Sequence, residues 1–220
     1  GDRLGSGEVL DLRSAHARAR DAVHEPLDVD ATRTALDALG LGPVSVVASA
    51  ARDRAEYLRR PDLGRMPGAD FALPPVEADV ALVIADGLSA TAVHEHGLPL
   101  AQAIVRALGD GLRIAPPIVA TGARVALSDH IAVALGVPTV VMLIGERPGL
   151  SVPSSLGIYL THHPQIGLPD SRRNCISNVH PPDGLGYDRA AAVLAALVHG
   201  ARELGQSGVR LKDTAGELPP

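Results

Sequence analysis

The sequence predicts an α/β protein with a Rossmann-like or flavodoxin-like, mostly parallel sheet that is flanked by helices and preceded by an N-terminal helical extension. Short β-branched runs alternate with helical segments from about residue 75 onward, an order of elements typical of parallel sheets. The run at 138–144 (PTVVMLI) is almost wholly apolar, which indicates a strand that helices bury on both faces. These two observations predict the fold class.

Residues 1–74 are predicted to form the helical extension and to dock a partner chain. A helical pattern covers 15–40 and ends at Gly40, a strand-like run follows at 43–49, and a second helix covers 50–58. The end of this second helix and the loop after it contain tyrosine and several arginines, which protein interfaces favour as anchors. The plainer alternative is a charged face exposed to solvent.

Residues 75–212 are predicted to form one Rossmann-like, ligand-contacting domain, and 213–220 a C-terminal tail. The pattern of apolar runs, helix caps and glycine stops marks its elements. In chain order they are a strand at 79–85, a helix ending at 108, a strand at 112–120, a helix at 128–135, a strand at 138–144, a strand at 155–160 and a helix at 187–204.

Composition excludes several classes of function. The 220-residue chain has a net charge of −5, three Tyr, one Phe and no Trp. Nucleic-acid binding relies on clustered Lys and Arg and on exposed aromatic side chains, so no nucleic acid is expected as a partner. The longest apolar runs, 80–85 and 139–145, are far shorter than the ~20 residues of a membrane span. The single cysteine, Cys175, cannot form a disulfide within the chain, which favours a cytoplasmic location.

Two loops are candidate ligand-binding segments, because open parallel sheets bind ligands beyond the carboxyl ends of their strands. The segment 86–89 (DGLS) is either a turn in which Asp86 or Ser89 caps a helix, or a helix start whose N–H groups bind a phosphate or amide oxygen. The segment 145–151 (GERPGLS) either places its charges in surface salt bridges or lets Glu146 accept hydrogen bonds from a polar ligand. Spacing alone leaves these alternatives open.

Cys175 also has two interpretations. A free cysteine is most often a small buried residue, whereas a nucleophile needs a neighbour that stabilises the thiolate, for which Arg173 and His180 are candidates. A metal site is not expected, because Cys175 has no cysteine partner at ligand spacing and the histidine pair at 162–163 lacks the i,i+4 spacing of helical ligands.

Six short segments follow one another along the chain: 57–65 (YLRRPDLGR), 85–89 (ADGLS), 123–125 (ARV), 143–151 (LIGERPGLS), 155–159 (SLGIY) and 173–178 (RNCISN). Each segment is weak evidence alone. In this order, spread over most of residues 15–212, they make the chain resemble the small (light) subunit of ethanolamine ammonia-lyase. One departure is Ala123, which stands where the family usually has glycine.

The resemblance implies one component of a carbon–nitrogen lyase that uses adenosylcobalamin to convert ethanolamine to acetaldehyde and ammonia. The implied partner is a large TIM-barrel subunit that binds the amino alcohol, and the small subunit closes over the other side of the corrin in a higher-order hetero-oligomer. By resemblance, the cobalamin contacts fall on Val125, Glu146 and Cys175, within the domain 75–212. This chain would then hold no catalytic residue and no metal ligand, and its packaging in a bacterial microcompartment is left open.

The residue types at these positions suit a corrin, which is a broad disc edged with amide groups. Val125 offers an apolar contact, Glu146 a hydrogen-bond acceptor, and Gly145 and Gly149 room for close approach. Two rival functions are weighed against this one. A stand-alone nucleotide-binding α/β enzyme would use Asp86 and Glu146 as its carboxylates, but the chain lacks a GxGxxG fingerprint and a P-loop. A non-catalytic interaction module for microcompartment assembly would bind a partner without contacting cobalamin.

Overall fold

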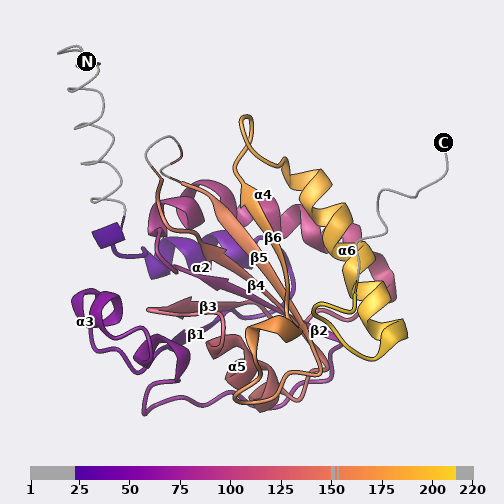
Figure 1. Cartoon of the computed structure of the whole chain (residues 1–220), viewed down its shortest axis with the longest axis horizontal. Coiled ribbons are helices and arrows are strands. Elements are labelled where there is room, and N and C mark those ends of the chain that lie inside the picture. The colour runs from indigo at the N-terminus through magenta and orange to yellow at the C-terminus, as the bar shows by residue number, and fades with distance from the viewer. Residues whose placement is uncertain (1–22, 150–151, 153, 212–220) are drawn as a thin grey trace, which may run out of the picture.

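The computed structural model describes residues 23–149, 152 and 154–211, which form one six-stranded sheet with helices on both faces (Figure 1). The strands are β1 (Ser45–Ala48), β2 (Val80–Ala85), β3 (Ile118–Thr121), β4 (Thr139–Gly145), β5 (Leu156–His162) and β6 (Asn174–Val179). The helices are α2 (Val29–Asp37), α3 (Arg54–Arg59), α4 (Ala90–Leu108), α5 (Leu127–Leu135) and α6 (Tyr187–Leu204), with 3-10 turns η1 (Leu63–Arg65), η2 (Gly109–Gly111) and η3 (Asp170–Arg172). The strand order is β1-β3-β2-β4-β5-β6.

The α/β class is confirmed, but the sheet is mixed, and a mostly parallel, Rossmann-like sheet is not confirmed. Each of the neighbours β1, β3, β2 and β4 is parallel to the next, whereas β5 runs antiparallel to β4 and β6 antiparallel to β5. The reason lies in the connection between β4 and β5, residues 146–155. A parallel return needs a crossover of about a dozen residues or more, usually including a helix, and this connection is shorter.

Most predicted elements appear near their expected positions, and β6 is the strand that the sequence analysis missed. It is an edge strand in which half-buried and exposed residues mix, so it lacks the apolar run that marks the inner strands. Of the predicted helix at 15–40, residues 29–37 form α2, whereas residues 25–28 are not helical. Residues 15–22 of that prediction and the predicted tail at 213–220 lie outside the described residues. β1, from the predicted segment 1–74, pairs with β3 at the opposite edge of the sheet, and the division at residue 74 stays a prediction.

Side chains alternate along the strands and pack into two separate cores. In β2, Leu82 and Ile84 pack with α2, α4 and α6, whereas Val83 and Ala85 pack with α5 on the other face. Figure 1 shows α4 and α6 on one side of the sheet and α5 on the other. Both cores consist almost entirely of aliphatic side chains, as the scarcity of aromatic residues requires.

The α5 side of the sheet is exposed where β5 and β6 form the edge of the sheet. α5 packs against β2 and β4, and the sheet extends past it through β5 and β6. In β6, Cys175 and Ser177 are exposed on the α5 side, while Ile176 between them packs against the core on the α6 side. This edge therefore presents a strand face to the surroundings, next to the loops that follow β3 and β4.

Candidate cofactor-binding face

The loops after β3 and β4 bring two of the predicted residues into one hollow. Val125 follows β3 and Glu146 follows β4, and both line a half-open hollow of about 240 Å³ together with Tyr159 from β5. A second hollow of about 370 Å³ shares three of its lining residues, Arg124, Val125 and Tyr159. The two hollows are therefore adjacent parts of one shallow surface.

Tyr159 connects Cys175 to this surface. The two residues are directly paired across the β5–β6 ladder, so their side chains lie next to each other on the same face of the sheet. Val125, Glu146 and Cys175 thus come together although they stand in three separate segments of the chain. We call the surface formed by Val125, Glu146, Tyr159 and Cys175 the Tyr159 face.

Glu146 is half-buried and held by two hydrogen bonds to the same carboxylate oxygen. Its Oε2 accepts a hydrogen bond from Ser155 Oγ at 2.7 Å and another from the backbone N–H of Asn178 at 3.1 Å. A Cβ at Gly157 would lie 3.1 Å from Glu146 Oε1 and 3.2 Å from Tyr159 Cε2. Glycine at position 157 therefore leaves room for the carboxylate and the tyrosine ring to lie beside each other.

Cys175 is exposed, which contradicts the interpretation of a small buried cysteine. The two candidates for stabilising its thiolate are engaged elsewhere. The Arg173 guanidinium is buried against Asp129 at 2.7 Å, and His180 Nε2 lies 2.7 Å from Asn178 Oδ1. Neither of these two side chains therefore supports a nucleophilic role for Cys175.

The loop that holds Val125 rests on the segment 57–65. The Tyr57 hydroxyl donates to the carbonyl oxygen of Ala123 at 3.0 Å, and the Arg124 guanidinium lies 4.7 Å above the Tyr57 ring. The backbone N–H of Arg124 donates to the Gly64 carbonyl oxygen at 2.8 Å. Tyr57 is fully buried and Gly64 is buried beneath the loop. Part of this segment therefore supports the loop from below, a role that the sequence analysis missed.

The two glycine-containing motifs 85–89 and 143–151 pack against each other. The N–H of Leu88 donates to the Gly145 carbonyl oxygen at 2.9 Å, and Ser89 caps α4 by accepting from the N–H of Ala92 at 3.2 Å. A Cβ at Gly145 would lie 2.1 Å from the Ser89 carbonyl oxygen. Glycine at 145 is thus required by this packing, rather than by the approach of a ligand as the sequence suggested.

Asp86 fills the crevice between the ends of β2 and β3. Its buried carboxylate accepts hydrogen bonds from the N–H groups of Gly122 at 2.9 Å and Ala123 at 3.1 Å, and from Arg54 Nη1 at 3.2 Å. Burial raises the pKa of Asp86, while these hydrogen bonds and the arginine oppose that shift. The N–H groups that could bind a phosphate in a doubly wound fold are therefore occupied by the protein's own carboxylate.

Comparison with known proteins identifies the family. The family model of the ethanolamine ammonia-lyase light chain matches residues 1–212 of the sequence. The ethanolamine ammonia-lyase small subunit of Rhodococcus erythropolis is 57% identical over 215 residues, which cover 98% of this chain and 84% of that protein. The small subunit of Ralstonia nicotianae is 48% identical over 228 residues, which cover 100% of this chain and 83% of that protein. The chain belongs to the ethanolamine ammonia-lyase light-chain family. It is therefore one subunit of a lyase that acts as a heteromeric enzyme.

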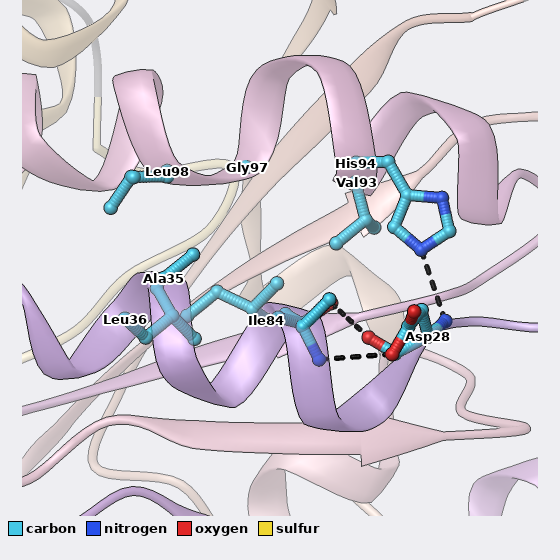
Figure 2. Close-up of a pocket in the computed structure, with 10 residues that line it drawn as sticks. Asp28, Ala35, Leu36, Ile84, Val93, His94, Gly97 and Leu98 are labelled. Atoms are coloured by element: carbon cyan, nitrogen blue, oxygen red, sulfur yellow. Dashed lines mark hydrogen bonds between the residues drawn. The ribbon is translucent and has the colours of Figure 1, made fainter.

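This light chain has a further cavity of about 350 Å³ between α2 and α4, and none of the predicted residues lines it. Figure 2 shows Ala35 and Leu36 of α2 across from Val93 and Leu98 of α4. At its rim, the N–H of Asp28 donates to His94 Nε2 at 3.0 Å. Leu36 and Val93 belong to the core on the α4 side, so the cavity lies on the opposite side of the sheet from the Tyr159 face.

Within residues 23–149, 152 and 154–211, no group of three or more His, Cys, Asp or Glu side chains is placed to hold a metal ion. In the same part of the chain, every helix is too short or too polar to cross a membrane.

Within the Tyr159 face of this light chain, Tyr159 itself is the residue to which the sequence analysis gave no role. Two signals could have found it. The chain has only three tyrosines, and Tyr159 follows Gly157 by two positions, which puts both on one face of a strand.

Proposed function

We propose that this light chain forms one side of an adenosylcobalamin site, in which Val125, Glu146 and Cys175 contact the cofactor at an interface with the large subunit of ethanolamine ammonia-lyase. The enzyme so formed converts ethanolamine to acetaldehyde and ammonia. The observation that carries the proposal is the convergence of the three residues on the Tyr159 face, although they come from different loops and strands.

The residues of the face fit the chemistry of a corrin. Val125 is half-buried and offers an apolar contact, and Glu146 is a hydrogen-bond acceptor for amide N–H groups. Gly157 keeps a Cβ away from the carboxylate. When bound, adenosylcobalamin supplies the radical chemistry of the reaction. The light chain's own residues bind the cofactor, orient it and limit the access of water to it.

The shape of the face supports a role for a second chain. Hollows of about 240 and 370 Å³ are half-open and far too small to enclose a cobalamin, whereas a protein normally buries most of the surface of a ligand that it retains. The large TIM-barrel subunit is proposed to cover the rest of the cofactor and to hold the substrate, within a higher-order hetero-oligomer. Docking of that subunit on the exposed part of residues 1–74 stays a prediction, as do a cytoplasmic location and microcompartment packaging.

The test uses the light chain co-expressed with its large subunit. Adenosylcobalamin is titrated into the complex and its binding is followed by absorbance. Glu146→Gln keeps the size of the side chain but removes its charge, and it is expected to weaken binding about tenfold, since hydrogen bonds to charged groups contribute about 1.5–3 kcal/mol. Glu77→Gln is the matched control, because the Glu77 side chain is 95% exposed and lines neither hollow.

The titration separates the proposal from its rivals. Equal cobalamin affinity of the wild type and Glu146→Gln, in an intact complex, would contradict the role of Glu146 as a contact. A stable complex that binds no cobalamin at all would favour the non-catalytic interaction module. A light chain that binds a nucleotide on its own would favour the stand-alone enzyme, which the occupied crevice at Asp86 disfavours.

A further inference from the structure

The geometry assigns Tyr159 as a further cobalamin-contacting residue, whose hydroxyl group and the Glu146 carboxylate together bind one primary amide at the corrin edge. This inference rests on the proposed function and adds a residue to it. Three features of the structure carry it: the position of Tyr159 in both hollows, its spacing from Glu146, and its pairing with Cys175.

Tyr159 occupies the centre of the proposed site. It lines both the hollow that contains Glu146 and the neighbouring hollow that contains Arg65. Tyr57 also lines the first hollow, but it is fully buried and its hydroxyl is bound to Ala123. Tyr159 is only half-buried, so part of its side chain is open to a ligand on this surface.

The side chain of Tyr159 is adjacent to those of both Glu146 and Cys175. A single point, the position of a Cβ at Gly157, is 3.1 Å from Glu146 Oε1 and 3.2 Å from the Tyr159 ring. Tyr159 is also paired with Cys175 across the ladder. A ligand that touches both Glu146 and Cys175, as proposed, therefore lies beside Tyr159.

The hydroxyl and the carboxylate complement each other chemically. Burial raises the pKa of the Tyr159 hydroxyl well above its usual value, and a hydrogen bond with the Cys175 side chain and the charge of Glu146 raise it further. The group therefore stays protonated and remains a hydrogen-bond donor, which can exchange the sulfur for a carbonyl oxygen of a ligand. A carboxylate only accepts hydrogen bonds, whereas a primary amide offers N–H donors and a carbonyl acceptor. The amide N–H groups can then bind Glu146 while its carbonyl oxygen accepts from Tyr159.

The experiment measures adenosylcobalamin binding by absorbance in the complex with the large subunit. Tyr159→Phe retains the ring and removes the donor, and it is expected to weaken binding about threefold to tenfold, the range that one net hydrogen bond produces. Tyr187→Phe is the matched control. This variant also removes one hydroxyl. Tyr187 is the first residue of α6, its hydroxyl lies 2.8 Å from His96 Nδ1 of α4, and it lines neither hollow. Unchanged cobalamin affinity is expected for it.

A second variant tests the same pair without altering either functional group. Gly157→Ala inserts a methyl group between Glu146 and the Tyr159 ring and is expected to weaken binding at least as much as Tyr159→Phe. Wild-type affinity in Tyr159→Phe, together with weakened binding in Glu146→Gln, would overturn the inference and leave the proposed function standing. Wild-type affinity in both variants would overturn the proposed function itself.

Discussion

The buried ion pair of Arg173 and Asp129 connects the start of β6 to α5, and its loss is predicted to destabilise the light chain strongly. Guanidinium and carboxylate meet through two contacts, Nη1–Oδ1 and Nη2–Oδ2, each of 2.7 Å, and the two side chains are 2% and 1% exposed. Burial alone lowers the pKa of Arg173, but the hydrogen bonds and charge of Asp129 outweigh it and raise the pKa, so Arg173 stays charged. Thr161 Oγ1 accepts a further bond from Nη1 at 2.9 Å.

Asp129→Ala leaves this charged guanidinium buried without its main partner. Removing one member of a buried pair costs about 3–5 kcal/mol, because the other charge remains in a poorly solvating environment. Asp170 Oδ1 stays 3.2 Å from Arg173 Nε and compensates in part, so the lower end, about 3 kcal/mol, is expected. In a domain of this size the midpoint temperature of unfolding falls by about 2–4 °C for each kcal/mol of stability lost. The midpoint should therefore fall by roughly 10 °C.

Thermal and urea unfolding of the light chain, followed by circular dichroism, measure this loss. The matched control is Asp62→Ala, which breaks a shorter contact of 2.6 Å between Arg60 and Asp62 in which both side chains are 59% exposed. An exposed pair of this kind contributes little to stability, because water screens the two charges. Similar, small losses in both variants would refute the reasoning that burial rather than distance sets the strength of these pairs.

Two further predictions concern the support of the Val125 loop and the response to pH. Gly64→Ala would place a Cβ 2.8 Å from Tyr57 Cε2 and 2.9 Å from Arg124 Cγ, so a loss of about 1–3 kcal/mol in urea unfolding and weaker cobalamin binding by the complex are expected. His162 is 4% exposed, and burial lowers its pKa from 6.5 to about 4. As the pH falls below about 6.5 the unfolded chain takes up a proton that the folded chain does not, so the free energy of unfolding should drop by about 2 kcal/mol between pH 7 and pH 5.

Each of these two predictions has an internal control. Gly111→Ala introduces a Cβ with no atom within 4 Å and should change neither stability nor cobalamin binding. His162→Gln should reduce the difference in stability between pH 7 and pH 5, whereas His199→Gln, at an exposed position of α6, should leave it unchanged. An unaltered pH response in His162→Gln, or a neutral Gly64→Ala, would contradict the packing argument at that position.

The strands and helices near the middle of the sheet were predictable because their sequence patterns are strong. The run at 138–144 became β4, which is buried throughout, and the alanine-rich segment became α6 with the expected bounds. The direction of β5 was not predictable from its own residues, since an apolar run looks the same in both directions. The length of the connection at 146–155 carried that information, because it is too short for a parallel crossover.

The proximity of Val125, Glu146 and Cys175 was predictable only in part. Residues after parallel strands meet at one edge of a sheet, which explains why the loops with Val125 and Glu146 adjoin. Cys175 lies on β6, a polar edge strand without an apolar run, so its position depended on the resemblance to a family rather than on a pattern. The role of Tyr57 was hidden for a different reason, because charged neighbours made a fully buried tyrosine look like part of a solvent-exposed face.

The antiparallel pair β5–β6 explains why a light chain of this kind would bind a ligand on its face instead of at the edge of its sheet. The edge crevice between β2 and β3 is closed by Asp86, which takes the N–H groups that a ligand would need. β5 and β6 extend the sheet past α5 and expose Tyr159 and Cys175 beside the loops that follow β3 and β4. Such a face is broad, shallow and built from rigid strands, which suits a flat ligand that a second protein covers. The same geometry holds too little volume to retain that ligand alone, so cofactor binding and subunit association should be coupled. Adenosylcobalamin should raise the affinity of the two subunits for each other, and the large subunit should raise the affinity of the light chain for adenosylcobalamin by the same factor.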